Sequence, residues 1–85
     1  MKKFTYVITD KAGIHARPAG TVVKKAKGFE SSITVRLGEK EADAANLLAL
    51  MSMGIKYGDE ITVEAEGADE EAACAAMEEV LKEKL

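Results

Sequence analysis

The sequence is poor in several residue types, and each shortage excludes a class of protein. Cys74 is the only cysteine among 85 residues, so the chain cannot form an internal disulfide and is not built for an oxidising compartment. The first ten residues lack an apolar run of signal-peptide length, and no stretch approaches the ~20 apolar residues of a membrane span. We therefore expect a cytoplasmic protein with no direct membrane insertion.

Metal, nucleotide and nucleic-acid binding are also poorly supported. With one cysteine and one histidine, the chain has no second strong ligand of either type to share a metal. It has no glycine-rich nucleotide loop. A formal net charge of −3 argues against a nucleic-acid partner. We predict no metal and no cofactor.

The charges are unevenly distributed along the chain. Basic residues gather in the first third, at Lys11, Arg17, Lys24, Lys25 and Lys27, whereas residues 59–83 are predominantly acidic. An acidic partner could therefore find a basic face on an acidic protein, and complementary charge would speed their encounter. The simpler interpretation of each single lysine is a solvated helix face.

Hydrophobic periodicity predicts seven elements in one domain spanning residues 1–85. Strands are predicted over 4–9, 32–37, 40–43 and 61–66, and helices over 16–27, 47–53 and 70–84. The order is β-α-β-β-α-β-α. Because every strand has one polar and one apolar face, we expect an antiparallel or mixed sheet with helices on one side, a two-layer α+β domain.

Local signals refine three of the predicted elements. Gly38-Glu39 suits a two-residue hairpin turn, and Asn46 and Asp69 suit the N-caps of the second and third helices. Gly20 is unfavourable inside a helix, so either another backbone approaches it or the helix tolerates it. The buried stripe of the last helix is predicted to comprise Ala73, Cys74, Met77 and Val80 or Leu81.

His15 stands between a glycine turn and a helix start, which is an unusual place for a histidine with only a structural role. Histidine is not a favoured N-cap, and unpaired amides and the positive dipole end there favour an anion. Arg17 follows two residues later, and its guanidinium fork matches phosphate oxygens. The positive helix end also disfavours imidazolium, leaving a neutral nucleophile near pH 7. These features are typical of a phosphorylated histidine.

The run GIHARPA at residues 13–19 resembles the active-site signature of the HPr family, the small histidine phosphocarriers of the bacterial sugar phosphotransferase system. The resemblance continues through residues 26–29, 50–54, 61–63 and 67–70, and so covers nearly the whole chain. It implies an open-faced β-sandwich, with a four-stranded antiparallel sheet and three helices on one face.

The resemblance also implies a relay in which the protein is a covalent carrier and not an enzyme. Enzyme I, charged by phosphoenolpyruvate, would phosphorylate Nδ1 of His15, and enzyme IIA domains of sugar permeases would receive the group. Arg17 would be the charge partner. At position 12, where family members often have a polar side chain, this chain has alanine, so the backbone amides of Ala16 and Arg17 would have to bind the phosphoryl group.

The helix predicted over 47–53 is apolar almost all round, so a small domain cannot bury every side of it. Leu47, Leu48 and Met51 form one approximate face, and Leu50 and Met53 form another. One face belongs to the core and the other is a docking patch, which we assign to Leu47, Leu48 and Met51. In the family this helix sits beside the histidine and touches partners.

Asn46 occupies the position at which many Gram-positive family members have a regulatory serine. Asparagine preserves the cap but has no hydroxyl to phosphorylate, so regulation at this position is predicted to be lost.

Two alternatives remain open at the level of sequence. One is a carrier of the same fold in a nitrogen-related or other regulatory phosphorelay. The other is a binding or interaction domain that never carries phosphate, against which His15 and Arg17 argue. A free-standing enzyme is least favoured, because an exposed turn offers no substrate pocket. We expect a monomer.

Overall fold

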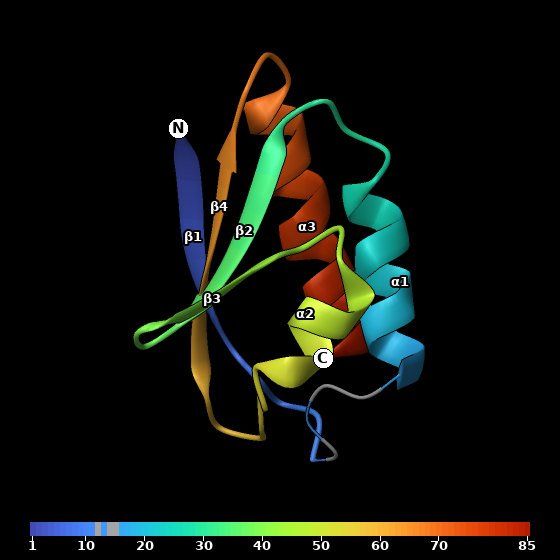
Figure 1. Cartoon of the computed structure of the whole chain (residues 1–85), viewed down its shortest axis with the longest axis vertical. Coiled ribbons are helices and arrows are strands. Elements are labelled where there is room, and N and C mark those ends of the chain that lie inside the picture. Colours follow the sequence, from blue (N-terminus) through green and yellow to red (C-terminus); the bar gives the residue numbers. More distant parts are fainter. Residues whose placement is uncertain (12, 14–15) are drawn as a thin grey trace.

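The computed structural model of the chain describes residues 1–11, 13 and 16–85, and Figure 1 shows its seven elements. They are β1 Lys2–Val7, α1 Ala16–Ala26, β2 Ser32–Leu37, β3 Lys40–Asp43, α2 Leu47–Ser52, β4 Glu60–Glu66 and α3 Glu70–Lys84. The predicted order is confirmed, and the bounds differ from the predicted ranges by two residues at most.

The strands form one sheet in the order β1-β4-β2-β3, and every neighbouring pair is antiparallel. In the two central strands Val35 lies opposite Val63, and Val63 also lies opposite Phe4 of β1. Figure 1 shows the three helices on the same side of this sheet, and the other face is open. The antiparallel alternative and the open-faced β-sandwich are thus both confirmed.

The core lies between the sheet and the helices. α3 packs against β1 and β4, α1 packs against α3, and α2 packs against α1 and β3. The predicted stripe of α1 is buried at Ala19, Val22, Val23 and Ala26. On α3 the buried residues are Ala73, Met77, Val80 and Leu81. Cys74 lies at the margin of the core, and burial, with the nearby Glu78 charge, raises the pKa of its thiol.

The glycines behave in different ways. Gly38 has φ +62° in the turn that joins Leu37 to its partner Lys40, so the hairpin forms as predicted. At Gly20 a Cβ would meet no atom of residues 1–11, 13 and 16–85 within 4 Å outside its own helix, so no other described backbone approaches and the helix tolerates this residue.

The two predicted N-caps have different outcomes. Asn46 caps α2, because its side-chain oxygen accepts a hydrogen bond from the Ala49 amide at 3.1 Å. Asp69 is the N-cap residue of α3, as predicted, but its side chain makes no capping bond to that helix. Its carboxylate instead accepts hydrogen bonds from the Glu30 and Ser31 amides, both at 2.9 Å, and from the Ser31 hydroxyl at 2.5 Å.

The bonds of Asp69 join the turn before α3 to the loop after α1, and we call this group of residues the Asp69 clasp: Glu30, Ser31, Gly67 and Asp69. At Gly67, with φ +152°, a Cβ would lie 2.7 Å from Ser31 Cα, so the two loops are in direct backbone contact. Hydrogen bonds from the Ser31 hydroxyl and the Glu30 amide hold the pKa of Asp69 below its ordinary value.

Candidate functional site

The candidate site is the junction between β1 and α1. His15 and Ala12 lie outside the described residues, so the structure describes the site through the residues that flank them, Gly13 on one side and Ala16 on the other. Helix α1 begins at Ala16, as predicted, and Pro18 is buried in its first turn. That turn carries no acidic residue, so no carboxylate of its own offsets the positive end of the helix.

Main-chain hydrogen bonds hold the segment that leads into the site. The Ile8 amide donates to the Asp59 carbonyl at 2.9 Å, immediately after β1 ends. The Thr9 and Asp10 amides both donate to the Leu85 carbonyl, at 2.7 and 2.8 Å, and the Thr9 hydroxyl donates to the same oxygen at 2.6 Å. The loop is thereby fixed between the turn before β4 and the residue after α3.

Gly13 is buried and tightly confined. Its φ is +68°, and its amide donates to the Asp10 carbonyl at 2.8 Å. A Cβ at this position would lie 2.8 Å from the Ile55 carbonyl oxygen and 3.0 Å from Lys56 Cα. Both the conformation and the close backbone approach therefore require glycine here. The sequence indicated a glycine turn here but carried no signal of the contact with Ile55 and Lys56.

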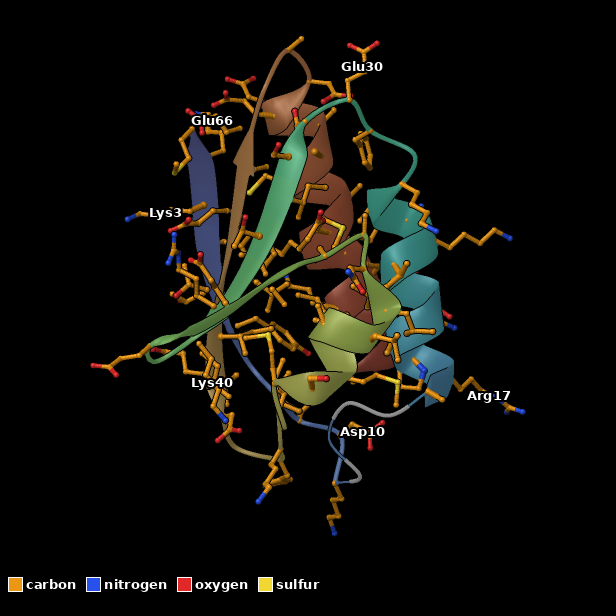
Figure 2. All side chains as sticks on the ribbon, in the orientation of Figure 1. Lys3, Asp10, Arg17, Glu30, Lys40 and Glu66 are labelled. Atoms are coloured by element: carbon orange, nitrogen blue, oxygen red, sulfur yellow. The ribbon has the colours of Figure 1, made fainter. Side chains whose placement is uncertain are left out.

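Arg17 is exposed, and Figure 2 shows its side chain extending outward from the start of α1. Within residues 1–11, 13 and 16–85 it makes no ion pair. A shallow depression beside it is lined by Asp10, Arg17, Pro18, Thr21, Glu83 and Lys84. The guanidinium is thus available to an anion at the helix start, and the end of α3 contributes charges of both signs nearby.

The five leucine and methionine side chains of α2 and its C-cap divide into the two faces that the sequence suggested. Leu47, Leu48 and Met51 are 39%, 80% and 39% exposed, whereas Leu50 and Met53 are 0% and 4% exposed. Leu50 and Met53 therefore belong to the core. Because α2 packs against α1, the exposed group lies on a helix adjacent to the one that begins at the site.

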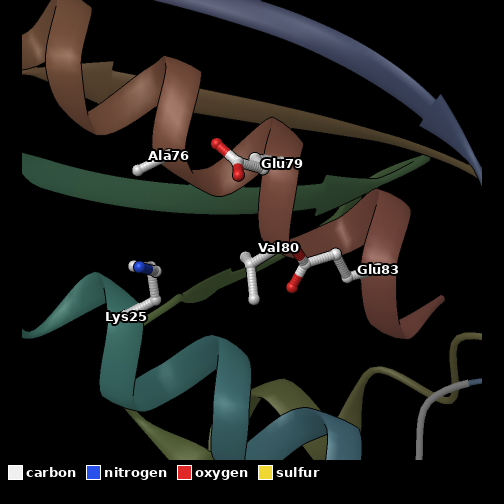
Figure 3. A pocket seen from close by; sticks show the side chains of 5 residues that line it. All are labelled: Lys25, Ala76, Glu79, Val80 and Glu83. Carbon is white, nitrogen blue, oxygen red and sulfur yellow. The ribbon is translucent and has the colours of Figure 1, made fainter.

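The basic residues of α1 do not all share one environment. Lys24 and Lys25 are both exposed near the end of the helix. Figure 3 shows Lys25 across a small groove from Glu79 and Glu83 of α3. Lys25 therefore faces an acidic surface of its own chain. Lys24 does not line that groove; it lines a second depression with Thr21 and Phe29, to which Lys25 also contributes.

Neither a metal site nor a membrane span is found in the part of the chain that the structure describes. There, no group of three or more histidine, cysteine, aspartate or glutamate residues is arranged to hold a metal ion. In the same part, none of the helices has both the length and the apolar character needed to cross a membrane.

The open antiparallel sheet with helices on one face, and the start of α1 without acidic residues, agree with the histidine phosphocarrier family that the sequence resembles. Residues 2–83 match the family model described as the PTS HPr component phosphorylation site. The chain is 42% identical over 81 residues to the phosphocarrier protein HPr of Mycoplasma capricolum, covering 95% of this chain and 91% of that protein. It is 45% identical over 83 residues to HPr of Mycoplasma genitalium, covering 96% and 94%.

The fold agrees with these sequence matches. A solved structure of the histidine-containing phosphocarrier protein of a mycoplasma superposes with a TM-score of 0.94 at 40% identity, covering 96% of this chain and 93% of that one. The chain therefore belongs to the HPr family of phosphocarrier proteins.

Proposed function

We propose that this protein carries a phosphoryl group on His15, accepting it from phosphorylated enzyme I and passing it to enzyme IIA domains of sugar permeases. It would act in the cytoplasm, as a monomer of one domain spanning residues 1–85. One observation carries the proposal: the family's phosphorylation-site match spans the only histidine, directly before a helix whose first turn has no acidic residue.

The proposed chemistry needs little beyond positioning and charge. The unprotonated imidazole nitrogen, Nδ1 by family resemblance, attacks phosphorus, and a nitrogen–phosphorus bond forms. The bond from phosphorus to the donor breaks, and its electron pair leaves with the donor. In the neutral tautomer that carries its proton on Nε2, Nδ1 has a free lone pair, so no proton has to leave the attacking nitrogen. Delivery to the acceptor is the same step in reverse.

Arg17 and the amides of Ala16 and Arg17 would offset the charge of the bound phosphoryl group. The guanidinium is exposed and makes no ion pair among the described residues, so no competing carboxylate has to be displaced. An exposed site also keeps the attraction modest, which suits a carrier that must release its group.

Partners would dock on the exposed group of α2, which we call the α2 patch: Leu47, Leu48 and Met51. Flexible leucine and methionine side chains can adapt to several different partners. Exposed basic residues of the neighbouring α1, Arg17 and Lys24, would pair with acidic groups around such a contact. Asn46, at the start of α2, would leave this surface without regulation by serine phosphorylation.

The direct test is to incubate the protein with phosphoenolpyruvate and catalytic enzyme I, and to follow intact mass and acid lability. We expect one acid-labile phosphoryl group on the native chain and none on His15→Ala. The variant should fold normally, which circular dichroism would verify. Acid-labile phosphate on His15→Ala, or none on the native protein, would overturn the proposal.

A further inference from the structure

Asp59, in the turn between α2 and β4, is bonded to two segments that converge on the candidate site. Its carboxylate Oδ2 accepts a hydrogen bond from the Lys56 amide at 2.8 Å, and its own amide donates to the Lys56 carbonyl at 3.0 Å. Its carbonyl accepts a hydrogen bond from the Ile8 amide at 2.9 Å. One residue therefore fixes both the Lys56 turn and the chain as it leaves β1.

The Lys56 turn is the surface against which Gly13 lies. The atoms nearest to a Cβ at Gly13 would be the Ile55 carbonyl oxygen at 2.8 Å and Lys56 Cα at 3.0 Å. Both are main-chain atoms, which cannot move aside as the end of a flexible side chain can. A displacement of the Lys56 turn would therefore be transmitted to Gly13, which precedes His15 by only two residues.

We propose that Asp59 is a positioning residue for phosphoryl transfer, because it holds the Lys56 turn against Gly13 and so sets how the chain presents His15. The inference rests on the proposed function, in which His15 carries the phosphoryl group. Transfer depends on alignment of the reacting atoms, and a misplacement of about 1 Å is enough to cost about a hundredfold in rate. Asp59 acts through Lys56 and Gly13.

The chain offers a matched control for Asp59 and another for Gly13. Asp69 also has a carboxylate that accepts hydrogen bonds from main-chain amides, but in the clasp at the other end of the molecule. Gly38 has φ +62°, close to the +68° of Gly13, and a Cβ there would meet nothing within 4 Å. Asp69→Ala and Gly38→Ala therefore reproduce the lost bond and the backbone strain without touching the Lys56 turn.

The experiment compares Asp59→Ala, Asp59→Asn and Gly13→Ala with these two controls. For each variant, kcat and KM are measured with the carrier as the substrate of phosphorylated enzyme I, together with the free energy of unfolding. We expect Asp59→Ala to lower kcat about tenfold while KM changes less than about twofold, because docking is untouched. Asp59→Asn should restore kcat, since its amide oxygen still accepts the Lys56 bond.

Gly13→Ala should lower kcat in the same way. In the double variant that combines Gly13→Ala with Asp59→Ala, kcat should fall no further than in either single variant, because both substitutions act through one contact. The two controls should keep the native kcat even where they lose stability. A native kcat for Asp59→Ala, or an equal loss in Asp69→Ala, would overturn the positioning role alone. If Asp59→Ala does not fold, an equal kcat in Gly13→Ala and Gly38→Ala would overturn it. A native chain that accepts no phosphate would instead overturn the proposed function, and this inference with it.

Discussion

The two ends of the molecule use their polar groups in different ways. At the clasp end, side chains do the binding: the Asp69 carboxylate holds the Ser31 and Glu30 amides, and the Met1 ammonium pairs with Glu70 at 2.8 Å. At the site end, most of the hydrogen bonds that fix the loop are made between main-chain atoms, with the Leu85 and Asp59 carbonyls as acceptors. Most of the exposed side chains of the site end are therefore not needed to hold the loop and can contact other molecules.

This difference shows how a small carrier can be stable and still present a reactive surface. A protein of this size has little core to spare, so the leucines that remain exposed at one end contribute nothing to the core, and contacts elsewhere must supply the stability. The site end holds its loop with backbone groups that every residue possesses. Its side chains, Arg17 and the α2 patch, remain exposed.

The sharpest test of this contrast lies within α2, where buried and exposed leucines are neighbours. Leu50→Ala should lower the free energy of unfolding by about 3 kcal/mol, because it removes a fully buried side chain. Leu48→Glu should change that free energy by less than about 0.5 kcal/mol. It should nevertheless raise KM for enzyme I if the patch docks partners. Denaturant unfolding and transfer assays measure the two quantities, and a large stability loss in Leu48→Glu would contradict the assignment of faces.

Arg17 tests whether a side chain at the site end contributes to chemistry instead of stability. Arg17→Ala should slow phosphoryl transfer about tenfold, which corresponds to the loss of one charge-assisted hydrogen bond. Arg17→Lys should restore the rate only in part, because lysine lacks the planar fork. Thermal unfolding should be unaffected in both, since the side chain is exposed. Native transfer rates in both variants would remove Arg17 from the mechanism.

The Asp69 clasp predicts a loss of stability in acid. The pKa of Asp69 is lowered in the folded state, first by the Ser31 hydroxyl and then by the Glu30 amide. Its contribution is therefore complete above the unfolded pKa, and is lost as pH falls through the lower folded value. Urea unfolding of native protein and Asp69→Asn across this acidic range should show a shallower pH dependence in the variant. Identical pH profiles would show that the clasp does not depend on the charge.

Asn46 provides the smallest expected change in stability, and a qualitative change in modification. Asn46→Ser should leave the free energy of unfolding nearly unchanged, because both residues cap helices well. We expect no labelling of native protein by an HPr kinase and ATP, and labelling of Asn46→Ser. ATP-dependent phosphate on a serine of the native α2 would refute the loss of this regulation.

How far the sequence predicted the structure depended on the range of each contact. The Asn46 cap was predictable because its partner is three residues away. Asp69 occupies its predicted N-cap position, but its carboxylate binds amides 38 and 39 residues distant, which local pattern cannot reveal. Both faces of α2 are apolar, so spacing alone did not distinguish them, but the face assigned to docking is the exposed one. The histidine motif indicated the site, but no signal in the sequence linked Gly13 to the Ile55 backbone.

The hydrogen bonds of Thr9 to Leu85 join residues 76 positions apart in the chain. Closing so long a loop is entropically costly, and it becomes favourable only once α3 has packed against β1. We therefore expect the segment entering the site to order late in folding, after most secondary structure has formed. Phosphate acceptance during refolding should then lag behind far-UV circular dichroism. A partly folded carrier would then accept no phosphoryl group, so only fully folded molecules would take part in transfer.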